Sequence, residues 1–368
     1  MKQIGIISMQ RVVNHGSFLQ AYGLKKTIER VVPGAVCEFI DLKMAGERKA
    51  LTIYPKTFLF KMKCLGYKIF GYNDAYNEIK TIWHDRDYKS VYLNEIKKYL
   101  NITEEQNNKT NYDSVVVGSD EIFNCTQEDV WWTDPMFLFG EGVESSNIIS
   151  YAASFGFTTK ERLNDFNLYD RVRGNLKKFH SISVRDDNSF KLVEELTGEK
   201  PYKNIDPVLV YDFEKEVKNP NIKNYMIIYQ YTNRIKDKDI INQIKEFAKK
   251  NNLKIISVFG YCAWADKNIV CTPFEAMGYI KNADFVVTDT FHGCVMATKF
   301  NRPFAAFTRD SNYNKMFDLL KTFNLQGHII KDGEGVEDIL SRDTDWDKVN
   351  SIIKEQQKFS CEYLKANL

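Results

Sequence analysis

Short apolar runs alternate with amphipathic stretches along most of the chain, and this alternation constrains the fold more than any other feature. The apolar run at residues 3–8 is followed by residues 17–31, where apolar side chains recur at helical spacing. Pro33 and Gly34 end that helix, and residues 35–42 are typical of a second strand. Strand, helix and strand in this order build parallel sheets, so the sequence predicts an α/β fold.

The pattern continues as two series of strands and helices. In the first series we predict strands at residues 112–120, 147–156 and 181–186, with a helix at about 159–178. The second series begins with a strand at residues 224–232. It continues with strands at residues 253–261, 284–289 and 303–308 and helices at residues 239–251, 273–283, 291–300 and 314–323. A long helix from about residue 345 to 366 closes the chain.

Two interruptions divide these series. Residues 50–110 are rich in aromatic side chains and lack strand alternation, so we predict two or three inserted helices there. Residues 180–222 hold stretches rich in Pro, Asn and Lys, which are typical of a linker. The 368 residues suit two domains of roughly 100–200 residues each. We therefore expect two doubly wound, Rossmann-like domains, residues 1–180 and 181–344, that face a central cleft.

The charge balance and the cysteines exclude several kinds of function. The 51 basic and 49 acidic residues nearly cancel, which argues against the basic face that nucleic-acid binding needs. The seven cysteines are scattered and form no C-x-x-C pair. This distribution is typical of reduced thiols rather than of a disulfide framework or a zinc site, so we expect neither a metal nor a cofactor.

The sequence also bears on where the protein works. Its first residues start a strand directly and lack the apolar segment of a signal peptide. A run of ~18 consecutive apolar residues, as a spanning helix needs, occurs nowhere in the sequence. We therefore expect a cytoplasmic protein, and the sequence leaves open both a peripheral contact with the inner face of the membrane and the oligomeric state.

Candidate site residues lie where predicted strands end, because doubly wound sheets bind ligands beyond the carboxyl ends of their strands. Asn14 and Gly16 precede the first helix, and Ser119 and Asp120 end a predicted strand. Residues of these types can contact sugar hydroxyls. They can equally serve as turn and cap residues, and their spacing favours this second interpretation.

Arg185 follows the apolar run "SISV" at another strand end. Its planar guanidinium offers a permanently charged fork for a carboxylate or a phosphate. The alternative is an ion pair with Asp186 or Asp187, and the sequence supports both interpretations equally.

A histidine and a glycine lie where the strand at residues 284–289 turns into a helix, in the segment "TDTFHG". Helix N-termini attract anions, and Gly293 in the first turn would let a ligand or another backbone approach closely. In the alternative interpretation, Asp289 or Thr290 caps the helix and His292 packs at the sheet edge. Spacing alone favours the capped helix.

Together, these junctions resemble the polysaccharide pyruvyl transferase family over nearly the whole chain. "NHGSFLQAYGLKKTIE" resembles the family's Asn-Tyr-Gly and Leu-Gln-Ala-Tyr-Ala-Leu opening, and "YDSVVVGSDEIFN" resembles its Val-Gly-Ser-Asp-Gln segment. "ADFVVTDTFHGCVMATKFNRPFAAF" is similar to its Phe-His-Gly helix and the following strand. The middle and late segments of the family are matched by "SYAASFG", "ISVRDDNSFKLVEELTG", "NIDPVLVYD" and "NYNKMFDLLKTFNL".

The resemblance implies a GT-B-like fold in which the terminal helix, residues 345–368, packs back toward the N-terminal domain. It implies transfer of the pyruvyl group of phosphoenolpyruvate, as a ketal, onto a sugar of a cell-surface polysaccharide or of its lipid-linked precursor. Arg185 and His292 would be the catalytic and donor-site residues, with Gly293 beside them in the C-terminal domain. The acceptor side would be the N-terminal domain, where the cleft would be lined by Asn14, Gly16, Ser119 and Asp120.

The sequence departs from the family pattern at several positions. Glu121 stands where the family usually has Gln, and His15 where it has Tyr. Thr290 stands where some members have a basic residue, so we expect Arg309 or Lys315 to supply the missing positive charge at the donor site. A GT-B glycosyltransferase that uses a nucleotide sugar and a non-catalytic sugar-binding relative are the alternative functions.

Overall fold

The structure, a computed structural model, describes residues 1–40, 58–103, 107, 109–127 and 135–368. Residues 41–42 of the second predicted strand lie outside the described part of the chain. The same holds for residues 50–57, 104–106 and 108 of the predicted helical insertion.

The first sheet is parallel and has the strand order β2-β1-β3-β4-β5-β6. Its central strands are buried on both faces, as the continuous apolar runs of the sequence require for a sheet covered by helices. The strands are β1 (Lys2–Ile7), β2 (Ala35–Phe39), β3 (Ser114–Asp120), β4 (Ile148–Ala153), β5 (Ser183–Val184) and β6 (Tyr202–Lys203).

The second sheet begins later in the chain than residue 181. Both β5 and β6 belong to the first sheet, because Val184 pairs with Ala153 of β4 and Ser183 with Tyr202 of β6. The chain therefore crosses to the second sheet between Lys203 and Tyr225, inside the stretch predicted as a linker.

The second sheet is also parallel, with the strand order β11-β10-β7-β8-β9. The core strands β7 and β10 are buried along nearly their whole length. The strands are β7 (Tyr225–Tyr229), β8 (Lys254–Ser257), β9 (Lys267–Asn268), β10 (Phe285–Thr288) and β11 (Phe304–Ala306).

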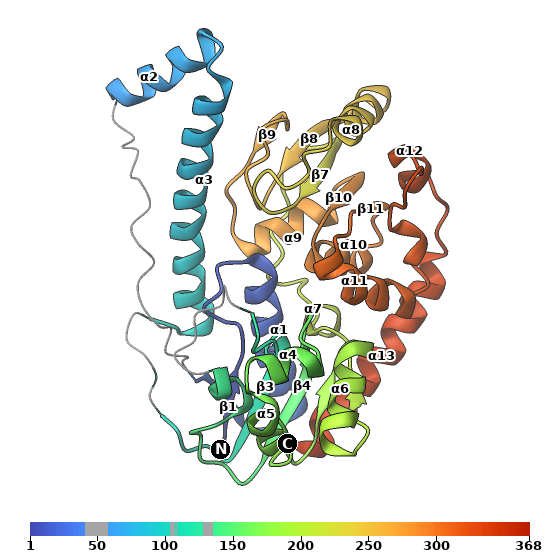
Figure 1. Cartoon of the computed structure of the whole chain (residues 1–368). Coiled ribbons are helices and arrows are strands. Elements are labelled where there is room, and N and C mark those ends of the chain that lie inside the picture. Colours follow the sequence, from blue (N-terminus) through green and yellow to red (C-terminus); the bar gives the residue numbers. More distant parts are fainter. Residues whose placement is uncertain (41–57, 104–106, 108, 128–134) are drawn as a thin grey trace.

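Helices cover both sheets and connect their strands (Figure 1). The helix predicted at residues 159–178 is two helices, because the chain turns at Asn167, whose φ of 55° is left-handed. The helices outside the insertion are α1 (His15–Val31), α4 (Lys160–Asp165), α5 (Tyr169–Leu176), α6 (Asp187–Thr197), α7 (Pro207–Val210), α8 (Lys238–Lys250), α9 (Pro273–Lys281), α10 (Phe291–Lys299), α11 (Asp310–Thr322), α12 (Val336–Leu340) and α13 (Trp346–Asn367).

The insertion contains a helical hairpin, α2 (Phe58–Ile69) and α3 (Asn73–Glu95), which is continued by a π-helical turn at Ile96–Leu100. In Figure 1, α3 runs alongside both halves of the molecule and α2 projects at its far end. Contacts to the second half fix α3 there. Thr232 Oγ1 donates to Asp85 Oδ1 (3.2 Å) and Tyr261 Oη to Asn77 Oδ1 (3.4 Å).

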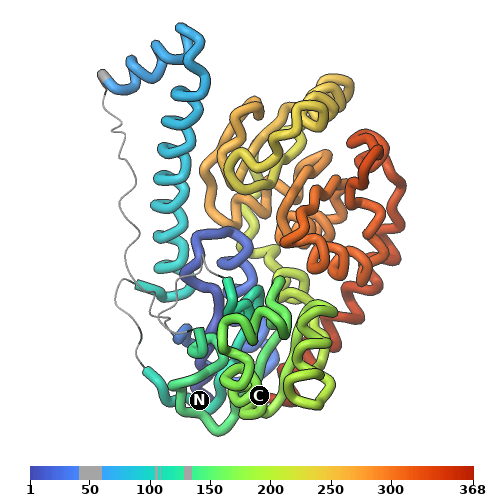
Figure 2. Tube along the Cα trace, viewed as in Figure 1, coloured from blue at the N-terminus to red at the C-terminus, as the bar shows by residue number. Residues whose placement is uncertain are grey.

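The terminal helix α13 starts beside the second sheet and ends against the first. Tyr363 Oη donates to the Ser150 carbonyl in β4 (2.9 Å), and Asn204 Nδ2 donates to Ser360 Oγ (3.3 Å). Figure 2 shows the two termini near each other at the base of the first half. The two halves are thus tied by α13 as well as by the linker.

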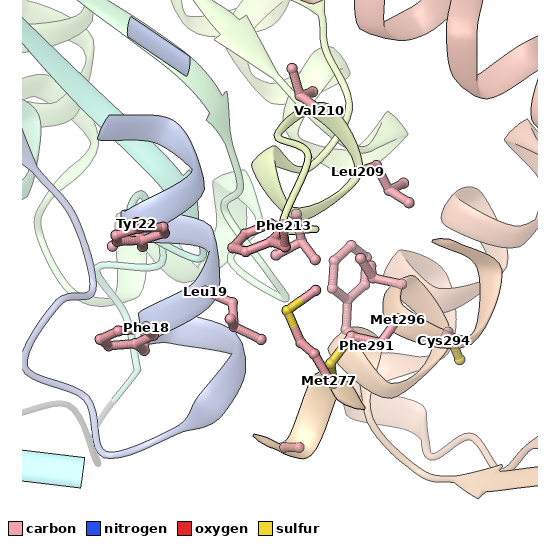
Figure 3. Close-up of a cluster of buried hydrophobic side chains, with 14 of the residues drawn as sticks. Phe18, Leu19, Tyr22, Leu209, Val210, Phe213, Met277, Phe291, Cys294 and Met296 are labelled. Carbon is pink, nitrogen blue, oxygen red and sulfur yellow. The ribbon is translucent and has the colours of Figure 1, made fainter. Parts of the chain in front are cut away.

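One continuous apolar core joins the two halves. In Figure 3, Phe18 and Tyr22 of α1 face Phe213 of the linker and Met277 of α9, with Phe291 of α10 nearby. Because this core lies between the two sheets, it holds the carboxyl ends of their strands toward each other. None of the described helices is long and apolar enough to cross a bilayer.

Candidate functional site

Four ionisable side chains form a chain of contacts where the two halves meet. Arg185 Nη2 donates to Asp120 Oδ1 (2.9 Å), and Arg185 Nη1 donates to Asp206 Oδ2 (3.3 Å). The same Asp206 oxygen lies 3.4 Å from His292 Nε2. Asp120 ends β3, Arg185 follows β5, and His292 lies in the first turn of α10, so the structure brings the predicted junctions together.

Arg185 is held by these carboxylates and not by its neighbours in sequence. Asp186 caps α6 by accepting from the Ser189 amide (2.8 Å), and Asp187 forms an ion pair with Lys203. The Arg185 guanidinium lies 4.1 Å from the centre of the Phe291 ring, a cation–π contact that fixes its plane. Its Nε is buried and makes no hydrogen bond in the structure.

Asp206 is the member of this group that sequence reasoning missed. Its Oδ1 caps α7 by accepting from the Val208 amide (2.9 Å), while its Oδ2 lies between Arg185 and His292. Burial alone would raise the pKa of Asp206, but His292 and Arg185 together lower it below its usual value. The carboxylate is therefore charged. Its sequence signal was the Asp-Pro pair in "NIDPVLVYD", which is also typical of an ordinary helix cap.

The N-terminus of α10 is capped, as the simpler interpretation of its sequence proposed. Thr290 Oγ1 accepts from the Gly293 amide (2.9 Å). A Cβ atom on Gly293 would lie 2.0 Å from Thr288 Oγ1, so the small size of this glycine makes room for a threonine side chain. Neither Thr290 nor Gly293 presents a free surface to a ligand here. His292 contacts Asp206 instead of packing at the sheet edge alone.

Gly16 brings α1 against the histidine from the other half. A Cβ atom at this position would lie 2.2 Å from His292 Nδ1. The neighbouring Asn14 caps α1 by accepting from the Gly16 amide (2.7 Å). Its Nδ2 also donates to Tyr231 Oη after β7 (2.6 Å), so Asn14 joins the two halves beside His292.

The two residues at the end of β3 have different surroundings. Ser119 is fully buried, and its Oγ donates to Gln20 Oε1 (2.7 Å), so it supports α1 rather than the site. Asp120 adopts a left-handed φ of 65°, an uncommon conformation for a residue with a side chain. Burial would raise the pKa of Asp120, but Arg185 and then His292 lower it below its usual value.

Lys315 does not supply the free positive charge expected of it. It forms an ion pair with Glu121, the residue that replaces the family's usual glutamine. Burial would raise the pKa of Glu121, but Lys315 lowers it. The acidic charge introduced at Glu121 is therefore neutralised by Lys315.

A second group of charges lies at the ends of β7, β10 and β11. Asp289 Oδ2 is 3.3 Å from Arg234 Nη1 and 4.0 Å from Arg309 Nε. Burial raises the pKa of Asp289 even though both arginines oppose this shift, and its Oδ1 makes no hydrogen bond. The side chains of Arg234 and Arg309 are 32% and 43% exposed, so two accessible cations share one carboxylate.

Tyr231 connects the two groups of charges. Its hydroxyl accepts from Asn14, beside His292, and its ring lies 4.2 Å from the Arg234 guanidinium carbon. Arg234 was also missed from the sequence, and it lies five residues after the end of β7 rather than directly after a strand. A cavity of about 120 Å³ lies elsewhere, beside His328 and Thr344, and none of the residues lining it belongs to either charge group.

The arrangement offers cationic groups that could hold an anion and a histidine that could move a proton. Among the described residues, no group of three or more His, Cys, Asp or Glu side chains could hold a metal ion. The positively charged groups are arginines, which are suited to carboxylates and phosphates.

Comparison with known proteins agrees with this fold. A Listeria monocytogenes protein, a proposed UDP-N-acetylglucosamine 2-epimerase, is 10% identical, with a TM-score of 0.50 over 98% of this chain and 94% of that one. The S. aureus MnaA–UDP co-structure is 11% identical, with a TM-score of 0.48 over 98% of this chain and 94% of that one. E. coli heptosyltransferase WaaC with ADP is 12% identical, with a TM-score of 0.39 over 96% of this chain and 99% of that one. At 10% identity, the likeness to the Listeria monocytogenes protein shows the fold alone, and no curated protein matches the sequence.

A comparison of the sequence with models of protein families identifies the family of this chain. The model of the polysaccharide pyruvyl transferase family matches residues 14–311, which contain both charge groups but not Lys315. The chain therefore belongs to the polysaccharide pyruvyl transferase family, as a transferase with two parallel sheets in Rossmann-like halves.

Proposed function

We propose that the protein transfers the pyruvyl group of phosphoenolpyruvate, as a ketal, onto a sugar of a cell-surface polysaccharide or of its lipid-linked precursor. The observation that carries this proposal is the Asp206 carboxylate that contacts both Arg185 and His292. It holds an anion-binding group and a proton-transferring group together where the strands of both sheets end.

Phosphoenolpyruvate carries a carboxylate and a phosphate, and the site offers a cationic group for each. The first is the buried guanidinium of Arg185, whose Nε makes no hydrogen bond and could donate one to a further acceptor. Arg234 and Arg309 form the more exposed pair, and two cations beside one carboxylate leave a net positive charge for a phosphate. Arg234 thus takes the role that the sequence suggested for Lys315.

The reaction balances with the groups present. Protonation of the donor's methylene carbon makes it a methyl group and leaves an oxocarbenium-like centre. One sugar hydroxyl attacks that centre, the bond from carbon to the phosphate oxygen breaks, and the second hydroxyl closes the ketal. Of the two hydroxyl protons, one balances the proton on the methyl group and the other leaves on phosphate. His292 is the group that moves such a proton, a role typically worth 10²–10⁴-fold.

Substrates must enter between the halves. Arg185, Asp206 and His292 are each at most 8% exposed, so the described conformation is closed over the reacting groups. We infer that the linker within residues 180–222 acts as a hinge that opens for binding. Closure would then exclude water from the oxocarbenium-like centre. We expect the reaction to take place in the cytoplasm, and a contact with the inner face of the membrane is open to test.

Binding of the donor tests the proposal without knowledge of the acceptor. Thermal-shift and calorimetric titrations should show binding of phosphoenolpyruvate by the wild type and none by Arg185→Ala. Arg185→Lys keeps the charge but loses the fork, so it should recover only part of the affinity. The matched control is Arg171→Lys, which changes an exposed arginine that pairs with Glu141.

Two results would overturn the assignment. Binding of a nucleotide sugar such as UDP-N-acetylglucosamine, with no response to phosphoenolpyruvate, would favour a glycosyltransferase. Unchanged affinity for phosphoenolpyruvate in Arg185→Ala would remove Arg185 from the donor site.

A further inference from the structure

Exposed apolar side chains gather at the tip of the helical hairpin. Of the thirteen large hydrophobic residues recorded as exposed in the described chain, five lie within residues 62–72. They belong to α2 and the turn that follows it, and together we call them the α2 surface: Met62 (53% exposed), Leu65 (47%), Ile69 (70%), Phe70 (78%) and Tyr72 (63%).

Helix α2 is apolar on two opposite faces and uses only one of them within the hairpin. Cys64 is buried against Ile79 and Trp83 of α3, and Phe60 and Tyr67 pack beside it at helical spacing. Met62, Leu65 and Ile69 also follow helical spacing and share the opposite face. In Figure 1, α2 projects beyond both halves of the molecule, and the side chains of this second face are exposed.

The charges around the α2 surface are mostly positive. Helix α2 carries Lys61, Lys63 and Lys68 and no acidic residue. Over residues 58–80, Lys80 adds a fourth cation, and Asp74 and Glu78 supply the acidic charges, which leaves a net charge of about two positive units.

Two of these lysines also lie against aromatic rings of α3. Lys68 Nζ is 5.5 Å and Lys80 Nζ is 5.7 Å from the centre of the Tyr76 ring. Their stems cover apolar surface while their ammonium groups remain at the rim, a disposition typical of residues at a membrane interface.

We propose that the α2 surface docks the protein on an anionic lipid bilayer. Helix α2 has 12 residues, whereas a spanning helix needs ~20, so α2 would lie in the plane of the interface. Its apolar face would enter the boundary of the acyl chains, and its flanking lysines would reach lipid phosphates. A second copy of the chain fits this surface less well, because a symmetric contact would bring like charges together.

Docking here would orient the reacting site relative to the membrane. Helix α3 leads from the α2 surface to Asp85, which contacts Thr232 in the segment that also carries Arg234. From Asn73 to Asp85 the helix rises about 18 Å at ~1.5 Å per residue. This consequence for a lipid-linked acceptor rests on the proposed function, whereas lipid binding itself does not.

Co-sedimentation with vesicles tests the proposal on the full chain. We expect binding to vesicles of phosphatidylcholine mixed with phosphatidylglycerol, and much weaker binding to phosphatidylcholine alone. Phe70→Gln should lower the partition coefficient by roughly tenfold, since it removes a large apolar contact. Lys68→Gln should lower it by about fivefold, and only on the anionic vesicles, since a lysine near such a surface contributes about 1 kcal/mol.

Phe166→Gln is the matched control, because Phe166 is an exposed phenylalanine (39%) outside the hairpin. Circular dichroism would confirm that all variants are folded. Equal binding by Phe70→Gln, Phe166→Gln and the wild type would overturn the proposal, as would absence of binding to anionic vesicles. A dimer in light scattering that Phe70→Gln dissolves would overturn it in favour of a second copy. Calorimetry with phosphoenolpyruvate distinguishes a failure of the proposed function from a failure of docking.

Discussion

Replacement of Gly16 by alanine should disturb the contact between the two halves at the site. The new Cβ atom would lie 2.2 Å from His292 Nδ1 and 2.3 Å from its Cγ, whereas ordinary contacts begin at 3.4 Å. Either α1 or His292 must therefore move by roughly 1 Å, and a displacement of that size can lower the rate by about 10²-fold.

The effect on stability follows from two opposed terms. Overpacking typically destabilises by about 1–3 kcal/mol. Alanine is the better helix former and offsets up to about 1 kcal/mol of this loss. Gly16→Ala should therefore lower the free energy of unfolding by about 0–3 kcal/mol and lower turnover by about 10²-fold.

Gly174→Ala is the matched control. Gly174 lies within α5, and a Cβ atom there would meet nothing within 4 Å. This variant should be as stable as the wild type or slightly more stable, with full activity. Urea denaturation and phosphate release from phosphoenolpyruvate would compare the two variants. If Gly16→Ala matches Gly174→Ala in both measurements, the close contact between Gly16 and His292 does not exist.

Three further predictions concern individual side chains. His292→Ala should lower turnover by 10²-fold or more in the same assay and leave the unfolding transition in place; turnover within about threefold of wild type would remove His292 from catalysis. Asp206→Asn should weaken phosphoenolpyruvate binding in calorimetry, because Arg185 and His292 lose their shared carboxylate; unchanged affinity and turnover would show that the contact is incidental. Burial lowers the pKa of His15 from 6.5 to about 4. As the pH falls, His15 therefore takes up a proton in the unfolded protein before it does so in the folded protein. This difference favours unfolding, so the free energy of unfolding should fall by about 3 kcal/mol as the pH drops from 6.5 to 4. In urea titrations at several pH values, the free energy of unfolding of His15→Asn should fall less steeply with decreasing pH than that of the wild type. An equally steep fall would show that another group takes up the proton.

The order of strands and helices could be predicted because it depends on local patterns. Apolar runs and helical spacing located the strands of both sheets except β6 and β9, which have two residues each. The very short β5 shows the limit of this reasoning. Two residues carry no periodicity of their own, and only pairing with β4 and β6 assigns them to the first sheet. This pairing places the strand predicted at residues 181–186 in the first sheet, although the predicted second domain begins at residue 181.

The site could be predicted in part. Arg185 and His292 were candidates because they follow strand ends, which converge in doubly wound sheets. The family resemblance gave them their donor-site and catalytic roles, which stay predictions. Asp206 was missed because its signal is that of a common helix cap, and its second role depends on residues from other elements. Lys315 was expected to be free because its ion pair with Glu121 joins residues far apart in sequence.

The fate of the pyruvyl group tests the central claim most directly. The protein would be incubated with isotopically labelled phosphoenolpyruvate and the cell-envelope glycolipid fraction of the organism that carries the gene. His292→Ala would serve as the inactive control. We expect the label in the glycolipid, at a ketal carbon bonded to two sugar oxygens by nuclear magnetic resonance, and an equal amount of inorganic phosphate. Phosphate release without label in any sugar, or sugar transfer from a nucleotide sugar in the same fraction, would contradict the account.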